Sequence, residues 1–171
     1  PEEEKDREWT GYIRAIEQAS AYGITSIQIP GSADFEMYDR IKEEGLLTCR
    51  IDIGGELTAD SAKLSALEKL RGKYNTEGDW IRFGYLKDFI DGTLGSATAM
   101  MFEPFNDEPA KTGLPQMTYE ELEKRVLAAD ARGFQIGIHA IGPRANNWIL
   151  NAYEKARLVN GIRDSRHRSE H

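Results

Sequence analysis

The feature that most constrains the fold is a regular alternation between short apolar segments and longer amphipathic ones. The apolar segments read ITSIQI, LLTCRIDIGG, WIRFGYLKDFI and FQIGIHA, and a glycine or proline lies at or just after the end of each. Short runs rich in β-branched and aromatic residues are typical of strands, and the segments between them carry apolar residues at helical spacing. Strands that alternate with helices in this way predict parallel β-α-β units.

The boundaries of the expected elements follow from glycine, proline and capping residues. Helices are expected at residues 9–22, 33–44, 58–70, 118–132 and 144–159. Strands are expected at residues 24–29, 46–55, 80–90 and 134–140, and the closing RHRSEH is expected to begin one more. Thr58, Asp60 or Ser61 is expected to cap the third helix, and Thr118 with Glu121 has the spacing of a capping box.

Two architectures fit this order: a (β/α)₈ barrel and an open, doubly wound sheet. The turn after the first strand, IQIPGSADF, lacks a glycine-rich phosphate loop, and neither GxGxxG nor GxxxxGK[ST] occurs in the chain. A complete barrel needs eight strands in about 250 residues. We therefore expect a partial (β/α)₈ TIM barrel in which residues 1–171 form a single α/β domain. This domain is expected to be the central part of a longer barrel, so that the first and last strands of the barrel are missing from the chain. A complete open-sheet domain is the alternative.

Composition and charge exclude several classes of partner. The net charge is -7 and basic residues form no cluster with aromatic ones, so nucleic acid is not an expected partner. No apolar stretch approaches the roughly 20 residues that span a bilayer, and the acidic N-terminal PEEEKDREW is unlike a signal peptide. A cytoplasmic location is favoured. Cys49 is the single cysteine, which excludes an internal disulfide, and its apolar neighbours predict a buried side chain.

Chemically active residues lie where three of the expected strands end. Lys87 lies in WIRFGYLKDFI with Asp88 and Asp91 close by, His139 ends FQIGIHA, and RHRSEH carries His167 and His171. Functional side chains collect at the carboxyl ends of strands in both architectures.

Each of these residues also has a structural interpretation. Lys87 could extend its ammonium to solvent, but its neighbours are apolar, and a buried ammonium requires a partner, a shifted pKa or chemical modification. His139 could be a hydrogen-bonded structural residue, and Glu170 with His171 could form a surface patch.

Three ordered motifs resemble the amidohydrolase superfamily of metal-dependent hydrolases. They read KDFIDGTLGSATA from Lys87, IHAIGPRA from Ile138 and RHRSEH from Arg166, and YGITSIQIPGSAD matches a fourth family segment upstream. The nearest branch is the one that contains N-substituted formamide deformylase. The resemblance runs nearly from end to end of the chain.

The resemblance implies a metal site and an activity. It implies that Lys87 is carboxylated and bridges two metals, and that His139 and His171 are metal ligands. The implied cofactor is one or two divalent ions, with zinc expected. The implied reaction is hydrolysis of a non-peptide C–N bond in a small amide, formamide or cyclic amide through a metal-activated water. No further catalytic residue is assigned within the chain.

Departures from the family pattern leave alternatives open. The family's His-x-His pair and its last aspartate have no counterpart, Pro143 stands where the family has aspartate, and Ser169 stands where it has isoleucine. We therefore expect this chain by itself to have little or no activity. One alternative is a non-catalytic, degenerate α/β barrel domain used for binding or assembly, and its open sheet edges predict a homo-oligomer. A weaker alternative is a Schiff-base lyase that uses Lys87.

Overall fold

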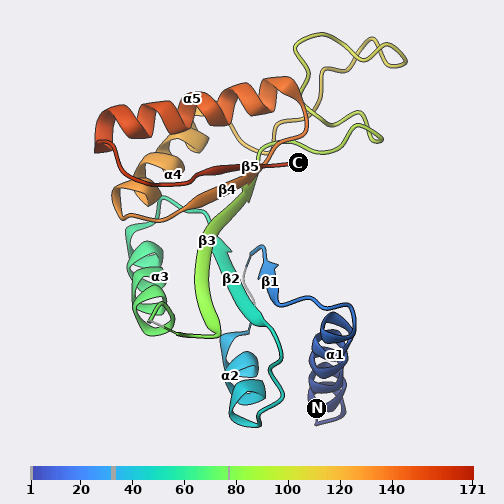
Figure 1. The fold of residues 1–171 in the computed structure, drawn as a ribbon. Coiled ribbons are helices and arrows are strands. Elements are labelled where there is room, and N and C mark those ends of the chain that lie inside the picture. Colours follow the sequence, from blue (N-terminus) through green and yellow to red (C-terminus); the bar gives the residue numbers. More distant parts are fainter. Residues whose placement is uncertain (1, 32–33, 77) are drawn as a thin grey trace. The chain divides into compact units, whose positions relative to one another are not determined.

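The computed structural model describes residues 2–31, 34–76 and 78–171, in which five helices alternate with five strands (Figure 1). The elements in chain order are α1 (Glu2–Ala21), β1 (Ser26–Ile29), α2 (Phe35–Glu43), β2 (Arg50–Glu56), α3 (Ser61–Tyr74), β3 (Ile81–Phe89), α4 (Tyr119–Ala131), β4 (Ile136–His139), α5 (Pro143–Asn160) and β5 (Arg168–Glu170). This is the element order that the hydrophobic pattern predicts. None of the described helices is both long and apolar enough to cross a membrane.

The strands form one sheet in the order β1-β2-β3-β4-β5. The ladders β1–β2, β3–β4 and β4–β5 are parallel. The Ile51 N–H donates to the Trp80 carbonyl and the Leu57 N–H to the Lys87 carbonyl, so β2 and β3 also run in the same direction. Because the strand order never reverses, the sheet has the connectivity of successive barrel units and not that of a doubly wound sheet. The predicted partial (β/α)₈ barrel is confirmed.

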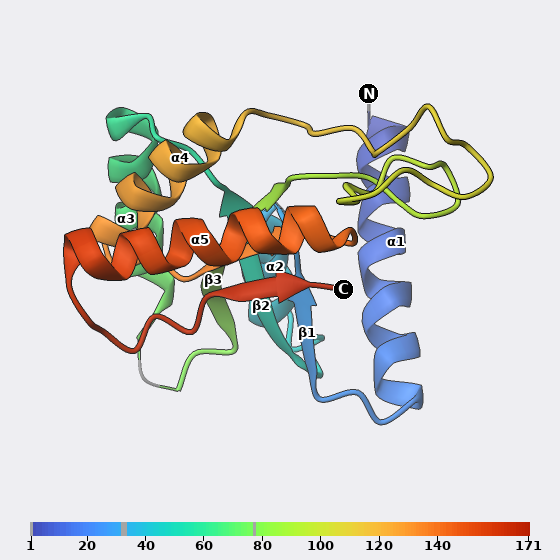
Figure 2. The same cartoon turned by 90° about the horizontal axis from the view of Figure 1, so that it is seen from above.

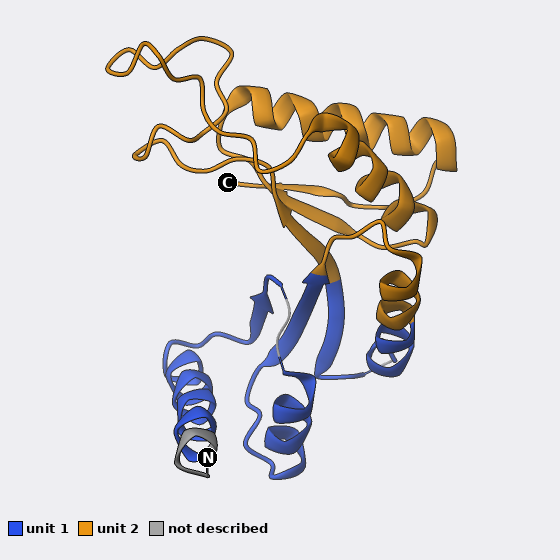
Figure 3. Ribbon diagram, turned by 180° about the vertical axis from the view of Figure 1, so that it is seen from behind, with its two compact units in different colours: residues 1–55, 69–84 blue, residues 56–68, 85–171 orange. Residues whose placement is uncertain are grey.

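Contacts divide the chain into two compact units (Figure 3). The first consists of residues 1–55 and 69–84, and the second of residues 56–68 and 85–171. The expectation of a single domain stays a prediction.

The first unit has an apolar core between its helices and strands. Its buried members are Ile16, Tyr38, Ile41, Cys49, Ile51, Ile53, Tyr74 and Ile81. Cys49 is fully buried, as its apolar neighbours predict. The N-cap of α2 is Asp34, whose side chain accepts the N–H groups of Glu36 and Met37.

Two helices of this region extend beyond their predicted ends. Helix α1 begins at Glu2 and not at residue 9, because the charged segment before Trp9 is rich in good helix formers. Helix α3 continues to Tyr74, where the sequence predicts a loop, because the Tyr74 ring is buried and its hydroxyl donates to Asp39 at 2.6 Å. The start of the second predicted helix, Ala33, lies outside the described residues.

The second unit packs helices against one face of its strands. Helix α4 contacts both α5 and β4. Thr118 caps α4 by accepting the Glu121 N–H, as the capping-box spacing predicts. The helix ends before Gly133, which has a φ of 74°. The apolar side chains of this unit that are fully buried include Leu86, Ile90, Leu122, Val126, Ile136, Ile138, Ile149 and Ala152.

Candidate metal centre at the carboxyl ends of the strands

Alternation along β3 and β4 separates an apolar face from a chemically active one. Leu86, Ile136 and Ile138 are fully buried on one face. Lys87 and His139 occupy the intervening positions, and successive strand residues point to opposite faces of a sheet. The second unit therefore presents the predicted lysine and histidine on the same face of neighbouring strands.

The amine of Lys87 lies in a mostly buried environment. The residue is 8% exposed, and its Nζ donates to the Asp88 carbonyl at 2.7 Å and lies 3.6 Å from the centroid of the Phe89 ring. Burial lowers the pKa of Lys87, while Glu170 and Asp88 oppose that shift. A lowered pKa increases the fraction of neutral, nucleophilic amine.

The imidazoles of His139 and His171 are in contact. Their ring centroids are 4.8 Å apart and the rings meet edge to face. His139 is 8% exposed and also contacts the Phe89 ring, with centroids 5.3 Å apart, whereas His171 is exposed. Phe89 thus touches both Lys87 and His139. Of the three residues that the resemblance implies as ligands, the structure brings His139 and His171 into contact and places Lys87 against the Phe89 ring that His139 also touches.

The carbonyl of Gly92 orients the His139 ring. His139 Nε2 lies 3.0 Å from the Gly92 oxygen and 3.6 Å from Asp91 Oδ1. Asp91 is 2% exposed, and its two oxygens accept the backbone N–H groups of Met100, Ile141 and Gly142 at 2.8–3.0 Å. Sequence reasoning places Asp91 near the site but does not find these bonds, because their donors follow in a later loop and turn.

Residues 91–116 form a long irregular segment that is held by its own hydrogen bonds. The N–H groups of Met101, Phe105 and Leu114 donate to the carbonyls of Thr112, Lys111 and Thr98. In Figures 1 and 2 the segment lies beyond the N-terminal end of α5, at the same end as the chain's C-terminus. Apolar and acidic residues of the segment, together with Pro143, line a pocket of about 480 Å³. The segment is therefore an ordered wall beside the strand ends.

Asp88 does not belong to this face. Its carboxylate pairs with Arg125 of α4 at 3.0 Å, and burial raises the pKa of Asp88. Its side chain lies on the helix side because it alternates with Lys87 and Phe89 along β3. The proximity of Asp88 to Lys87 in the sequence is therefore misleading.

Two residues that sequence reasoning does not assign to the site contribute to this face. Glu170 is the register partner of His139, and its carboxylate opposes the lowering of the Lys87 pKa by burial. Phe89 lies over the Lys87 amine. The signal that could find them is strand alternation, since Phe89 lies two residues after Lys87.

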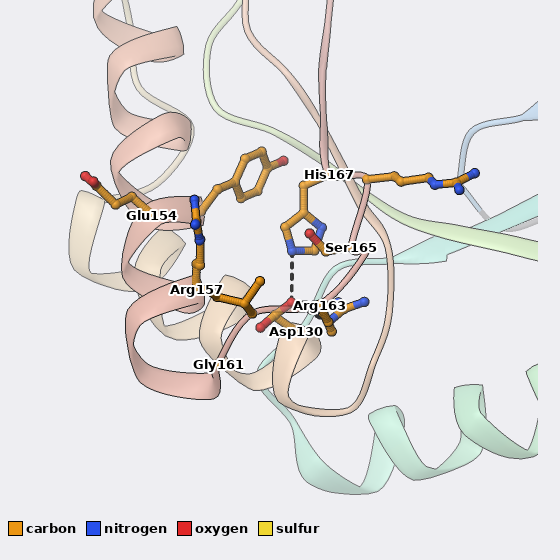
Figure 4. A pocket seen from close by; sticks show the side chains of 10 residues that line it. Asp130, Glu154, Arg157, Gly161, Arg163, Ser165 and His167 are labelled. Atoms are coloured by element: carbon orange, nitrogen blue, oxygen red, sulfur yellow. Dashed lines mark hydrogen bonds and ion pairs between the residues drawn. The ribbon is translucent and has the colours of Figure 1, made fainter.

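His167 is a structural histidine. Its Nδ1 accepts the Ile136 N–H at 3.1 Å, and its Nε2 lies 3.0 Å from Asp130 Oδ1 (Figure 4). Asp130 also accepts from Arg163 and Asn160. Asp130, Arg163 and His167 border a pocket of about 570 Å³. Within this pocket the Asp130 carboxylate is bonded by both Arg163 and His167.

The two departures from the family pattern have local structural explanations. Pro143 is the first residue of α5, a position where a missing N–H costs nothing, and Gly142 is its N-cap. The carboxylate at this helix N-terminus comes from Asp91 instead of residue 143. Ser169 is exposed, and its hydroxyl donates to Asn146 Oδ1 at 2.6 Å. The final strand therefore gains a polar contact at the position where the family has an apolar one.

The donor set fits part of a divalent metal site. Two imidazoles that touch each other and a lysine whose amine is predisposed to the neutral form are suitable donors, the lysine after carboxylation. Within the part of the chain that the structure describes, His, Cys, Asp and Glu side chains form no group of three that could hold a metal ion. Any full coordination shell would therefore need the modified lysine or donors from outside these residues.

The strand order and the strand-end residues define a partial (β/α)₈ barrel with its chemically active side chains at the carboxyl ends. The chain belongs to the amidohydrolase family, whose sequence profile matches residues 1–171.

Known proteins resemble parts or most of this chain. LONG AFTER FAR-RED 3 of Arabidopsis thaliana is 46% identical over 93 residues, which are 54% of this chain and 16% of that protein. The putative amidohydrolase YtcJ of Bacillus subtilis is 39% identical over 98 residues, which are 57% of this chain and 17% of that protein. The crystal structure of an uncharacterized metal-dependent hydrolase from Pyrococcus furiosus is 26% identical, with a TM-score of 0.67, and the match covers 85% of this chain and 30% of that one. The matched part of this chain is thus a small fraction of both curated relatives.

Proposed function

We propose that this chain is part of a metal-dependent hydrolase that cleaves a non-peptide C–N bond in an amide, formamide or cyclic amide. Membership of the amidohydrolase family supports this proposal, as does the likeness to a structure described as a metal-dependent hydrolase. The observation that carries it is the contact between the rings of His139 and His171, whose centroids are 4.8 Å apart. His139 lies on the strand next to that of Lys87, and His171 directly follows β5. The branch of N-substituted formamide deformylase is the proposed place within the family.

His139, His171 and carboxylated Lys87 are the proposed ligands of one or two divalent ions, with zinc expected. The neutral Lys87 amine attacks carbon dioxide, a C–N bond forms, and a proton leaves to water, which yields a carbamate anion. Burial favours this step because it lowers the pKa of Lys87 and so increases the fraction of neutral amine. The modification replaces a buried cation, which is costly, by an anion that a cation can stabilise.

A divalent ion held here would lower the pKa of bound water to about 7 and polarise the substrate carbonyl. The chain's own contribution is to orient the donors and to limit the access of solvent. Phe89 covers the Lys87 side chain, and the carbonyl of Gly92 holds the His139 ring. The ordered segment 91–116 forms a wall for the substrate.

Metal binding is tested by calorimetric titration of the 171-residue chain with Zn²⁺ and Co²⁺ in bicarbonate buffer. We expect His139→Ala and His171→Ala each to weaken binding at least tenfold. His167→Gln is the matched control, because glutamine can also accept from Ile136 and donate to Asp130, and its affinity should equal that of the unsubstituted chain. Equal affinities in all four proteins would contradict the proposed ligands.

The reaction is tested on the longest natural chain that contains this segment, after metal loading. N-substituted formamides, linear amides and cyclic amides are the substrates, and release of formate, amine or ring-opened acid is measured. We expect hydrolysis of at least one of these substrate classes, and we expect a chelator to abolish that hydrolysis. Metal binding without any hydrolysis would favour the non-catalytic domain, and borohydride trapping of a carbonyl compound on Lys87 would favour the lyase.

A further inference from the structure

Asp91 is a buried carboxylate whose role the proposed ligand set does not explain. The residue is 2% exposed, and its side chain faces the turn between β4 and α5. Oδ2 accepts the N–H groups of Met100 and Gly142, both at 2.8 Å, and Oδ1 accepts the Ile141 N–H at 3.0 Å. Three backbone donors from two separate segments therefore converge on one side chain.

These bonds hold the residue that follows Asp91 in a defined position. The Gly92 N–H donates to the Thr98 carbonyl at 3.2 Å, and a Cβ at residue 92 would collide with the Thr98 side chain. The Ile90 N–H donates to the His139 carbonyl at 3.0 Å, which joins the end of β3 to the end of β4. The Gly92 carbonyl is consequently held opposite the His139 ring.

The contact between Gly92 and His139 determines which imidazole nitrogen carries the proton. A carbonyl oxygen can only accept, so His139 Nε2, at 3.0 Å, must be the donor. In the neutral ring Nδ1 then has the free lone pair, and a metal binds a histidine through the unprotonated nitrogen.

We propose that Asp91 is a positioning residue: it anchors the Asp91–Gly92 turn so that the Gly92 carbonyl fixes His139 as the Nε2–H tautomer and leaves Nδ1 for a divalent metal ion. The metal part of this inference rests on the proposed function, whereas the tautomer does not. Asp91 touches neither metal nor substrate in this role. The carboxylate accepts the N–H groups of Ile141 and Gly142, which directly precede α5, and so lies near the positive end of the helix dipole.

The test is long-range ¹H–¹⁵N correlation of the imidazole nitrogens in the 171-residue chain without metal. We expect the unsubstituted chain to show a protonated Nε2 and an unprotonated Nδ1 for His139. Asp91→Asn places an amide N–H₂ against backbone donors, so we expect a mixture of tautomers and Zn²⁺ affinity reduced about 10- to 100-fold.

Asp88→Asn is the matched control. It makes the same substitution three residues earlier, on the opposite face of β3, where the partner is Arg125. We expect unchanged His139 signals in this variant.

Two results would overturn the inference. One is a protonated Nδ1 in the unsubstituted chain, which can be observed even if Asp91→Asn does not fold. The other is an Asp91→Asn protein that is less stable but retains both the His139 tautomer and the Zn²⁺ affinity, which would limit Asp91 to a structural role. Absence of Zn²⁺ binding in the unsubstituted chain would contradict the proposed function but would leave the tautomer result to decide the role of Asp91.

Discussion

Asp130 Oδ1 and His167 Nε2 lie 3.0 Å apart and join the end of α4 to the residue before β5. Both side chains are almost completely buried, and Arg163 bonds the same carboxylate. The His167 ring also packs against Tyr153, with centroids 4.7 Å apart. The pair therefore links α4, α5 and β5 of the second unit. Protonation of His167 is consequently expected to affect stability.

Stability should fall as the pH decreases below the ordinary histidine pKa of about 6.5. Burial lowers the pKa of His167 in the folded chain, although Asp130 opposes the shift. Between the unfolded and the folded pKa the unfolded chain binds a proton that the folded chain does not, so acid favours unfolding. In thermal melts, the melting temperature should be lower at pH 5.5 than at pH 7.5, and this decrease should be smaller in His167→Gln. An equal decrease in both proteins would contradict this account.

Lys87→Met should stabilise the metal-free chain by about 1 kcal/mol, because it removes a buried ammonium without removing the volume of the side chain. Lys63→Met is the control, since the side chain of Lys63 is 62% exposed and its substitution should change stability by less than about 0.5 kcal/mol. Urea denaturation without metal measures both. A destabilised Lys87→Met protein would show that the contacts of the amine with Asp88 and Phe89 outweigh its burial.

Thr118→Ala should cost about 1 kcal/mol, because the hydroxyl at the N-cap of α4 accepts the Glu121 N–H at 3.2 Å. Thr118→Ser retains the hydroxyl and should lose only a few tenths of a kcal/mol. Urea unfolding curves give the two differences. Equal losses in the two variants would indicate that the methyl group, and not the cap, is responsible.

Gly142→Ala should destabilise the chain by about 2 kcal/mol, because an added Cβ would collide with the backbone of Met100, which cannot move without displacing the segment 91–116. Gly95→Ala lies in the same segment, where a Cβ would meet no atom within 4 Å, and should change stability little. Thermal melts compare the two alanine variants. A Gly142→Ala protein as stable as Gly95→Ala would show that the Met100 backbone adapts.

Much of the fold is predictable because its signals are local. Thr118 and Glu121 are close in the sequence, so their cap can be read directly. The end of α3 could not be predicted in the same way, because Tyr74 is held by Asp39, 35 residues earlier. Helix ends that depend on such distant partners leave no mark in the local pattern.

In the candidate site, too, the features that depend on neighbouring residues can be predicted from the sequence, whereas those that depend on distant residues cannot. The sequence by itself determined the order of the elements and the N-cap of α4, since periodicity and motif spacing are properties of neighbouring residues. The three metal donors at strand ends stay a prediction. Only the tertiary structure decided that Asp88 faces α4 while Lys87 lies on the same face as His139, and that His167 pairs with Asp130 while His171 contacts His139. It also decided that Asp91 receives three backbone donors, two of them 50 and 51 residues away. The physical reason is that a side chain's partners are set by strand register and helix packing, which join residues that are far apart in the chain.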